Sequence, residues 1–488
     1  MLFINLLLSF DAVKFYNQLP TFFTYIFLLY FFLIGFSYIF MIFFSRSALK
    51  YHVNVNSFID YDVILTSPLQ PSLSIIAPAY NEGKTIIENV KSLLAMNYHN
   101  YEVLIINDGS TDDTLSKIIE YFSLEEIEYN YTSNLETSEI VSILKSTNPK
   151  WNKLLVINKI NGGKSDALNV GLNVAKGKYF ACIDVDCIID KKALLKMSKS
   201  FLEHQTSRVI ATGAVIGVSN NCEVENGNIN EMKMPKTWIG SIQTMEYFRA
   251  FLLGRVSWSR INGSIIISGA FGFFDKDLAI EVGGYNHKTV GEDMELTMRM
   301  RRKMLKDNIR HKVIFSPEPL CWTEVPEKHK ILKTQRRRWT RGTIESLWIH
   351  RRMFFNKDYG IIGWFSLPYW LLFEWLAPIL EFTGLIYFTL CALLGVINWP
   401  FFYLLLLLVY FFSTFVSLTS VLFHEYTYKQ YTRTKDIFKL IIACLIDPII
   451  FHPRIMFFAI YGNLDKLYNR KTSWGTMSRL GHSKKKNK

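Results

Sequence analysis

An uncharged stretch from Phe15 to Ser45 constrains the fold of this chain more than any other feature of its sequence. Its central part, Phe22–Phe44, consists almost entirely of apolar side chains. A helix rises about 1.5 Å per residue, so about 20 such residues cross the hydrocarbon of a bilayer. The run is too long for the apolar part of a cleaved signal peptide. We therefore expect a transmembrane segment within residues 1–46.

Charges on the two sides of this segment predict its orientation. Arg46 and Lys50 come shortly after it, whereas Lys14 before it is balanced by Asp11. Positive charges favour the cytoplasmic side. The chain beyond the segment, which begins with a linker over 47–70, is therefore expected in the cytoplasm at the inner (cytoplasmic) membrane. The formal charge of +13 (55 basic and 42 acidic residues) fits such a membrane face, an anionic substrate or a nucleic acid.

A second apolar block runs from 359 to 424, with Glu374 and Glu381 as its only carboxylates. Its length suffices for two crossings with a turn near Asn398-Trp399-Pro400. We therefore expect residues 351–424 to form an interfacial stretch and two transmembrane helices, at roughly 373–396 and 400–423.

A third apolar stretch, 437–461, is interrupted by Asp447-Pro448 and His452-Pro453-Arg454. Proline breaks helices, and charges are costly in hydrocarbon. We interpret 425–464 as a broken interfacial or re-entrant helix that does not span the bilayer. The basic tail, 465–488, then stays in the cytoplasm, and membrane lipids are expected partners of a multi-pass protein.

Residues 71–350 have the composition of a soluble domain. Short apolar runs that end in polar turns, LSIIAPAYNE, YEVLIINDGS and KYFACIDVD, alternate with helical-looking stretches. This alternation predicts an α/β fold with a mainly parallel sheet. Residues 125–150 are interpreted as a polar excursion between a helix and a strand. The six cysteines form no CxxC pair, which predicts reduced thiols without a metal role.

Acidic side chains gather where these strands end. Asp184 and Asp186 stand at i and i+2 after one apolar run, which suits a hard divalent cation bound to a diphosphate. Asp108 and Glu82 end two other runs, and Lys164 comes after two glycines that permit close approach of a phosphate. Each motif alone is also ordinary turn chemistry. Ligands of parallel sheets bind at the carboxyl ends of the strands, so together they predict one site.

The order and spacing of seven motifs resemble the membrane-bound inverting glycosyltransferases of family 2, which have the GT-A fold. The motifs are PAYNE, NDGST, NGGKSDALN, IDVDC, SGAFGFF, GEDMEL and QRRRW. This family includes cellulose, chitin and hyaluronan synthases, and the chain most resembles its bacterial poly-β-1,6-N-acetylglucosamine synthase group. The resemblance covers residues 71 to about 475. It implies a GT-A domain with a mixed, mainly parallel sheet, flanked by transmembrane helices.

The resemblance also implies a role for each motif. The donor is expected to be bound by Tyr80, Glu82 and Asp108 at the uridine and by Lys164, Asp184 and Arg338 near the diphosphate. Asp184 and Asp186 would hold the metal, Mg²⁺ or Mn²⁺. Asp293 would be the catalytic base, and the acceptor would contact Ser268, Gly269, Gln335 and Trp339. In the tail, Trp474 and Thr476 match a gating loop that closes over the donor, although Met477 replaces its usual arginine.

Elementary chemistry is consistent with these roles. Cleavage of the anomeric C–O bond places negative charge on the departing diphosphate, which a divalent cation, Lys and Arg neutralise. A carboxylate then suffices as base if it reaches the attacking hydroxyl. Other interpretations of single residues remain: Asp293 also fits the acidic first turn of a helix, and Trp339 fits a membrane-interface aromatic. The basic runs 299–312 and 336–341 also suit anionic lipid.

The sequence therefore predicts an enzyme that transfers N-acetylglucosamine from a UDP-sugar to a growing β-linked polysaccharide at the membrane. A single-addition glycosyltransferase with a lipid acceptor is the alternative within this class. A transporter with a degenerate transferase domain is the alternative outside it, and the complete motif set argues against that. No nucleic-acid-binding module is found. Three crossings are few for a self-contained polymer path, which suggests a second membrane subunit.

Overall fold

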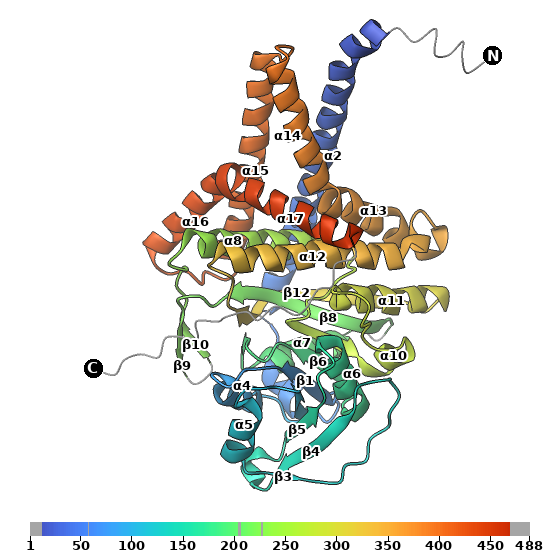
Figure 1. Ribbon diagram of the computed structural model, residues 1–488. Coiled ribbons are helices and arrows are strands. Elements are labelled where there is room, and N and C mark those ends of the chain that lie inside the picture. The colour runs from blue at the N-terminus through green and yellow to red at the C-terminus, as the bar shows by residue number, and fades with distance from the viewer. Residues whose placement is uncertain (1–11, 57, 204–205, 226–227, 469–488) are drawn as a thin grey trace, which may run out of the picture.

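The computed structural model describes residues 12–56, 58–203, 206–225 and 228–468. Figure 1 shows an α/β domain below and a group of long helices that projects from it above. A layer of helices lies between these two parts. The expected gating residues, Trp474 and Thr476, lie outside the described residues.

The α/β domain is built on a mixed sheet. Among the described residues, the sheet has ten strands in the order β3-β4-β5-β2-β1-β6-β11-β8-β12-β7. Most strands point the same way, and β4, β11 and β7 run against them. This confirms the expected mixed, mainly parallel α/β sheet. The strands are β1 Leu73–Ala79, β2 Tyr101–Asp108, β3 Leu124–Glu126, β4 Ile140–Ser146, β5 Leu154–Lys159, β6 Tyr179–Ile183, β7 Ile188–Ile189, β8 Arg208–Val218, β11 Phe271–Asp275 and β12 His311–Thr323, and β9 Glu223–Glu225 pairs separately with β10 Asn228–Glu231.

The central strands are continuous apolar runs because helices cover both faces of the sheet. In β1 every residue but Pro78 is buried, and β2 is buried except for Glu102. The interpretation of 125–150 as an excursion outside the sheet was incomplete, because β4 and most of β3 extend the sheet there. The domain helices are α4 Ile86–Leu94, α5 Thr114–Phe122, α6 Lys164–Val174, α7 Ala193–Glu203, α8 Trp238–Phe248, α9 Val256–Arg260, α10 Lys276–Glu281, α11 Glu292–Lys306 and α12 His329–Ile349.

Three long helices project away from the sheet (Figure 1). They are α2 (Ala12–Asn56), α14 (Ala377–Leu393) and α15 (Trp399–Thr427). The turn expected near residue 398 is present, and the Asn398 side chain caps α15 by accepting a hydrogen bond from the N–H of Phe401. The expected linker, 47–70, is instead largely helical, because α2 continues to Asn56 and α3 covers Tyr61–Thr66.

The last helices lie across the base of this group, next to α8 and α12 (Figure 1). A π-helical turn, η7 (Asp447–Phe451), separates α16 (Thr434–Ile446) from α17 (His452–Leu467). The helix is thus irregular at Asp447-Pro448, but it continues through Thr434–Leu467 without a strong bend, and the expectation that this stretch does not span the bilayer stays a prediction. Arg337 of α12 forms a two-pronged ion pair with Asp465 of α17, which ties these helices to the domain.

The helices that are long and apolar enough to cross a membrane differ from the three crossings expected from the sequence. Among the described residues, three helices are long and apolar enough to cross a membrane: Phe23–Asn56, Trp399–Thr427 and Thr434–Leu467. The expected crossing at 373–396 qualifies only as part of a pair, 362–375 with 377–393, that is bent by 41°. The number of crossings and their topology thus stay predictions.

Candidate active site

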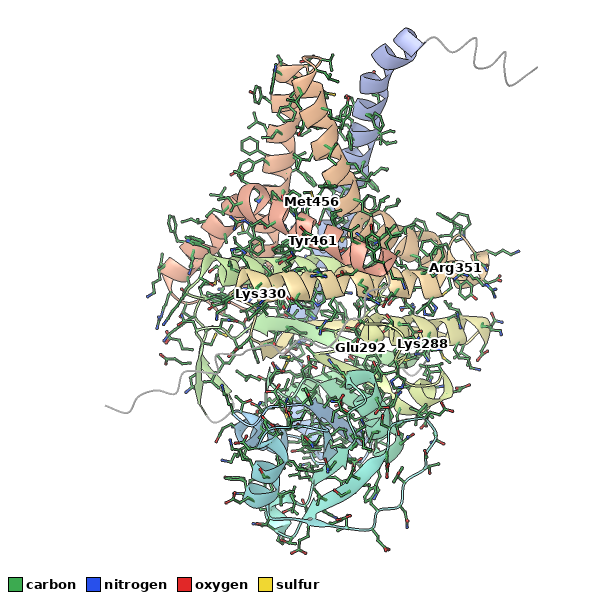
Figure 2. All side chains as sticks on the ribbon, in the orientation of Figure 1. Lys288, Glu292, Lys330, Arg351, Met456 and Tyr461 are labelled. Carbon is green, nitrogen blue, oxygen red and sulfur yellow. The ribbon has the colours of Figure 1, made fainter. Side chains whose placement is uncertain are left out.

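A cavity of about 2100 Å³ begins at the carboxyl ends of β1, β2 and β6. It contains the polar turns after these strands and extends to the base of the long helices. Glu292 and Met456 both line it, and Figure 2 shows them at the levels of the sheet and of α17. The structure therefore brings the strand-end residues into one site, as predicted.

Asn81 helps to hold together the turns after β1 and β2, together with hydrogen bonds from the N–H groups of Glu82 and Gly83. Asn81 adopts a left-handed backbone conformation, with a φ of 57°. Its side-chain oxygen accepts hydrogen bonds from the N–H groups of Thr111 (2.8 Å) and Asp112 (3.3 Å). This contact places Tyr80, which is 44% exposed, and Glu82 on the cavity wall.

Asp108 supports the glycine loop rather than standing free in the cavity. Its carboxylate accepts hydrogen bonds from the N–H groups of Gly162 (2.9 Å) and Gly163 (2.8 Å). The amine of Lys159 donates to it at 2.5 Å and also pairs with Asp166 at 2.6 Å. A direct contact of Asp108 with uridine stays a prediction. Lys159 is not predicted from the sequence, because no local pattern signals its buried position.

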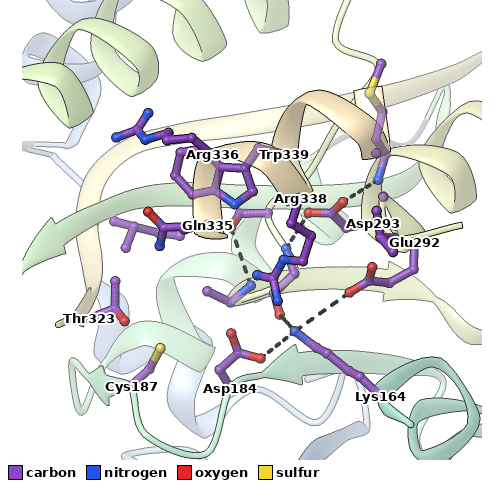
Figure 3. A pocket seen from close by; sticks show the side chains of 18 of the residues that line it. Lys164, Asp184, Cys187, Glu292, Asp293, Thr323, Gln335, Arg336, Arg338 and Trp339 are labelled. Carbon is purple, nitrogen blue, oxygen red and sulfur yellow. Dashed lines mark hydrogen bonds and ion pairs between the residues drawn. The ribbon is translucent and has the colours of Figure 1, made fainter. Parts of the chain in front are cut away.

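Lys164 lies at the centre of the charged part of the site (Figure 3). Its amine is 2.5 Å from Asp184 Oδ1, 3.3 Å from the carbonyl oxygen of Gly269 and 4.0 Å from Glu292 Oε1. Burial lowers the pKa of Lys164, but the negative charges of Asp184 and Glu292 and the hydrogen bond to Asp184 outweigh it, and the pKa is raised. The lysine is therefore a permanent cation where the resemblance implies a diphosphate.

Asp184 and Asp186 form a DxD motif. Their carboxylates suit a divalent cation whose remaining ligands come from a bound diphosphate. Asp184 and Asp186 both line the cavity, and each is partly exposed. Among the described residues, no group of three or more His, Cys, Asp or Glu side chains is arranged to hold a metal. Two carboxylates are a sufficient protein contribution when diphosphate oxygens supply further hard ligands. The donor set thus suits Mg²⁺ or Mn²⁺ bound together with a nucleotide.

Asp293 stands in the first turn of α11, and backbone contacts fix it there. Its Oδ2 accepts a hydrogen bond of 2.9 Å from the N–H of Gly269. Just before it, Gly291 packs against Gly342 of α12 so closely that an added Cβ would lie 2.7 Å from the carbonyl oxygen of Gly342. This contact joins the start of α11 to α12. The helix-start interpretation of Asp293 is therefore also correct, and it does not exclude a role in the cavity.

Glu345 of α12 reinforces this junction. Its Oε2 accepts hydrogen bonds from the Thr289 hydroxyl (3.0 Å) and from the N–H of Val290 (3.1 Å). Arg341 donates to Oε1 at 2.8 Å. Glu345 is not among the residues predicted from the sequence, although it stands six residues after Trp339 on the same helix.

The QRRRW motif occupies α12 above Lys164 (Figure 3). Trp339 is 40% exposed and lines the cavity, with the guanidinium of Arg336 4.5 Å from its ring centre. Arg336 is held by a two-pronged ion pair with Glu246. Gln335 and Arg338 also line the cavity. Trp339 thus lies on the cavity wall, and both its contact with an acceptor and its membrane-interface interpretation stay predictions.

Ser268 and Gly269 line the cavity between Lys164 and Asp293. An added Cβ on Gly269 would lie 3.5 Å from both Asp293 Oδ2 and the amine of Lys164. All predicted site residues within the described chain thus line one cavity. Their binding and catalytic roles stay predictions.

Comparison with known proteins agrees with the motifs. Residues 71–342 match the model of the family described as glycosyltransferase like family 2, and residues 282–486 match one described as chitin synthase. The poly-beta-1,6-N-acetyl-D-glucosamine synthase of Staphylococcus aureus (strain COL) is 27% identical over 307 residues, which is 62% of this chain and 61% of the relative. The Staphylococcus epidermidis synthase is 30% identical over 277 residues, or 56% of this chain and 55% of the relative.

Among solved structures, a mannosyltransferase from Pyrobaculum calidifontis in complex with GDP-Man and Mn²⁺ is 14% identical, with a TM-score of 0.47. The match covers 88% of this chain and 100% of that chain. The first family match extends over more than half of the present sequence, whereas the chain aligns with less than two thirds of the length of the curated relatives. The predicted enzyme class is confirmed: the chain belongs to glycosyltransferase family 2.

Proposed function

We propose that this chain is a metal-dependent inverting enzyme that transfers N-acetylglucosamine from its UDP donor to a hydroxyl of a growing β-linked glycan. One observation carries the proposal: the DxD carboxylates, Lys164, Asp293 and Trp339 line the same cavity. The sugar and the linkage are suggested by the poly-N-acetylglucosamine synthases to which the chain is similar.

In the proposed reaction the acceptor hydroxyl lies against Trp339 and attacks the anomeric carbon of the donor. The new C–O bond forms as the bond to the diphosphate breaks, and its electron pair leaves with UDP. Asp293 takes the hydroxyl proton on Oδ2, the oxygen that Gly269 orients. Direct displacement inverts the anomeric centre, so an α-linked donor gives a β-linkage.

The departing diphosphate requires positive charge close to it. Lys164 is a buried cation held within 4.0 Å of two carboxylates, and Arg338 lines the same wall. Asp184 and Asp186 would hold Mg²⁺ or Mn²⁺, which supplies further charge without proton transfer. Glu292 stays close to this cluster, where burial raises its pKa more than Lys164 lowers it.

We place the catalytic domain on the cytoplasmic side of the inner membrane. The apolar helices α2 and α15 contain candidate membrane spans, and α14 belongs to a bent pair that is a further candidate, which supports membrane insertion. The basic residues Arg46 and Lys50 support this orientation. A lipid acceptor remains the alternative for the second substrate. A tag inserted near residue 130 should be protected from protease in right-side-out vesicles, and cleavage from outside would contradict the orientation.

The test is UDP release by the purified full-length protein in nanodiscs, with a panel of UDP-sugars and N-acetylglucosamine oligomers as acceptors. UDP-N-acetylglucosamine should support turnover, EDTA should abolish it, and Mn²⁺ or Mg²⁺ should restore it. Asp186→Asn should abolish turnover, whereas Asp190→Asn, a nearby substitution outside the cavity lining, should not. Turnover that persists in chelator refutes metal dependence. No UDP release with any donor refutes the proposed function.

A further inference from the structure

An arginine outside the seven motifs is buried in α11, about two turns after Asp293. The side chain of Arg301 is 1% exposed and is one of the largest fully buried side chains of the described residues. It has no carboxylate partner among them, and burial lowers its pKa to about 9. Burial of an unpaired charge costs far more than burial of an apolar side chain of similar length. The position of Arg301 therefore requires an explanation other than filling the core.

Arg301 uses its guanidinium to hold the backbone of one segment. Its Nη1 atom donates a hydrogen bond of 2.7 Å to the carbonyl oxygen of Ser264, and its Nη2 atom donates one of 2.6 Å to that of Asn262. Both carbonyl groups belong to residues 262–269, which we call the clamped segment. A planar guanidinium can reach two carbonyl oxygens at once, which an ammonium group does less well. Arg301 thus fixes the start of the clamped segment to α11.

The other end of the clamped segment contacts α11 through Asp293. The N–H of Gly269 donates a hydrogen bond of 2.9 Å to Asp293 Oδ2. Between the two ends, Ile265 belongs to the same core cluster as Met298 of α11. Asp293 and Arg301 are about 12 Å apart along the helix axis. The clamped segment therefore runs along α11 and is attached to it at both ends.

Further contacts tie the start of the clamped segment to other parts of the molecule. Asn262, whose φ is 53°, donates from Nδ2 to the carbonyl oxygen of His311 in β12 at 3.0 Å. The hydroxyl of Ser366, the last residue of the π-helical turn η5 (Ile362–Ser366), donates to the Gly263 carbonyl oxygen at 2.7 Å. These contacts should keep the segment folded when Arg301 is replaced. Arg301 differs from them because it lies on the helix that carries Asp293.

We propose that Arg301 is a positioning residue for the proposed reaction: it sets the register of the clamped segment on α11, so that the Gly269 N–H holds Asp293 Oδ2 towards the acceptor hydroxyl. This inference rests on the proposed function, which takes Asp293 as the base. Arg301 is not among the described residues that line the cavity, so it acts through Gly269 and not on the substrate. A base must lie within hydrogen-bond reach of its proton, and a displacement of about 1 Å can slow a reaction by about 10²-fold.

The first test measures the Gly269 amide and needs no activity. Hydrogen–deuterium exchange is followed on the full-length protein in nanodiscs, without substrate, and is resolved to single amides by mass spectrometry. The Gly269 amide should exchange about tenfold faster in Arg301→Met than in wild type. Arg302→Met is the matched control, since Arg302 is the next residue on α11 and is exposed. Exchange at Gly269 that is unchanged in Arg301→Met overturns the proposal.

The second test uses the UDP-release assay. Arg301→Met should lower kcat by about 10–100-fold, with an unchanged KM for the donor and an unchanged calorimetric affinity and stoichiometry for UDP. Full stoichiometry excludes a loss of folded protein as the cause. Arg301→Lys, which keeps a donor for one carbonyl oxygen, should restore part of kcat, and it replaces Arg301→Met if the latter does not fold. Arg302→Met should resemble wild type.

A double variant tests whether Arg301 acts through Asp293. If it does, Asp293→Asn/Arg301→Met should be no slower than Asp293→Asn alone, because the group that Arg301 positions is already lost. Losses that multiply in the double variant overturn the proposal, as does a wild-type kcat in Arg301→Met. Faster exchange at Gly269 in Arg301→Met, when the wild type releases no UDP from any donor, supports the clamp and refutes the proposed function alone.

Discussion

Removal of the Lys159 amine tests whether a buried cation holds together Asp108 and Asp166 beneath the glycine loop. The amine lies 2.5 Å from Asp108 and 2.6 Å from Asp166, and its side chain is fully buried. Lys159→Met keeps most of the volume but removes the charge. It leaves two buried carboxylates that face each other with no cation between them.

That geometry sets the size of the expected loss. Breaking a buried ion pair by removing one partner costs about 3–5 kcal/mol. Asp108 keeps the N–H groups of Gly162 and Gly163, so we expect the lower end of this range. In a domain of roughly 250 residues, 1 kcal/mol lowers Tm by about 2–4 °C, which predicts a fall of about 6–12 °C.

Thermal unfolding in nanodiscs, monitored by intrinsic fluorescence, measures this fall. Lys153→Met is the control, because among the described residues the amine of Lys153 contacts the Tyr98 carbonyl oxygen at 3.2 Å and the Tyr101 ring and no carboxylate, and its side chain is partly exposed. The double variant Lys159→Met/Asp166→Asn should recover part of the loss, since it removes one unpaired charge. A Tm within about 2 °C of wild type in Lys159→Met would refute the reasoning.

Three further predictions concern Asp293 and the contacts that hold it. Asp293→Asn should lower turnover by about 10²–10⁴-fold with little change in the calorimetric affinity for UDP, and loss of UDP binding would move this residue to the donor site. Gly291→Ala forces the α11–α12 junction apart, so kcat should fall more than KM rises and the free energy of unfolding should decrease by about 1–3 kcal/mol. The control is Gly254→Ala, whose Cβ would meet nothing closer than 3.9 Å and which should resemble wild type. Burial raises the pKa of Glu345, but hydrogen bonds from Arg341, Val290 and Thr289 lower it by more. The pKa therefore lies below its ordinary value. Its contribution to stability is therefore present above the unfolded pKa of about 4.3 and is lost as pH falls through the folded value, so Tm should decline less steeply below about pH 5 in Glu345→Gln.

The sequence by itself determined the strands that carry the site and the residues that line the cavity next to the sheet. Continuous apolar runs that end in Asn, Asp and Gly specify strands and the turns after them, and parallel strands bring those turns to one edge. Asp184 and Lys164 could therefore be placed in one site. The resemblance added Asp293 and Trp339, which the sheet pattern alone does not connect because they come from α11 and α12.

Only the tertiary structure decided how Asp108 and Lys159 share their charges and how α16 and α17 run across the base of the long helices. It also showed that most of the expected linker over 47–70 is helical. The cavity continues to Arg255 and Trp370 at the base of the long helices, which the sequence did not indicate. The physical reason is that periodicity reports whether a residue is buried, not which distant segment buries it. Lys159 and Asp166, or Arg301 and Ser264, become partners only through packing between elements far apart in the sequence.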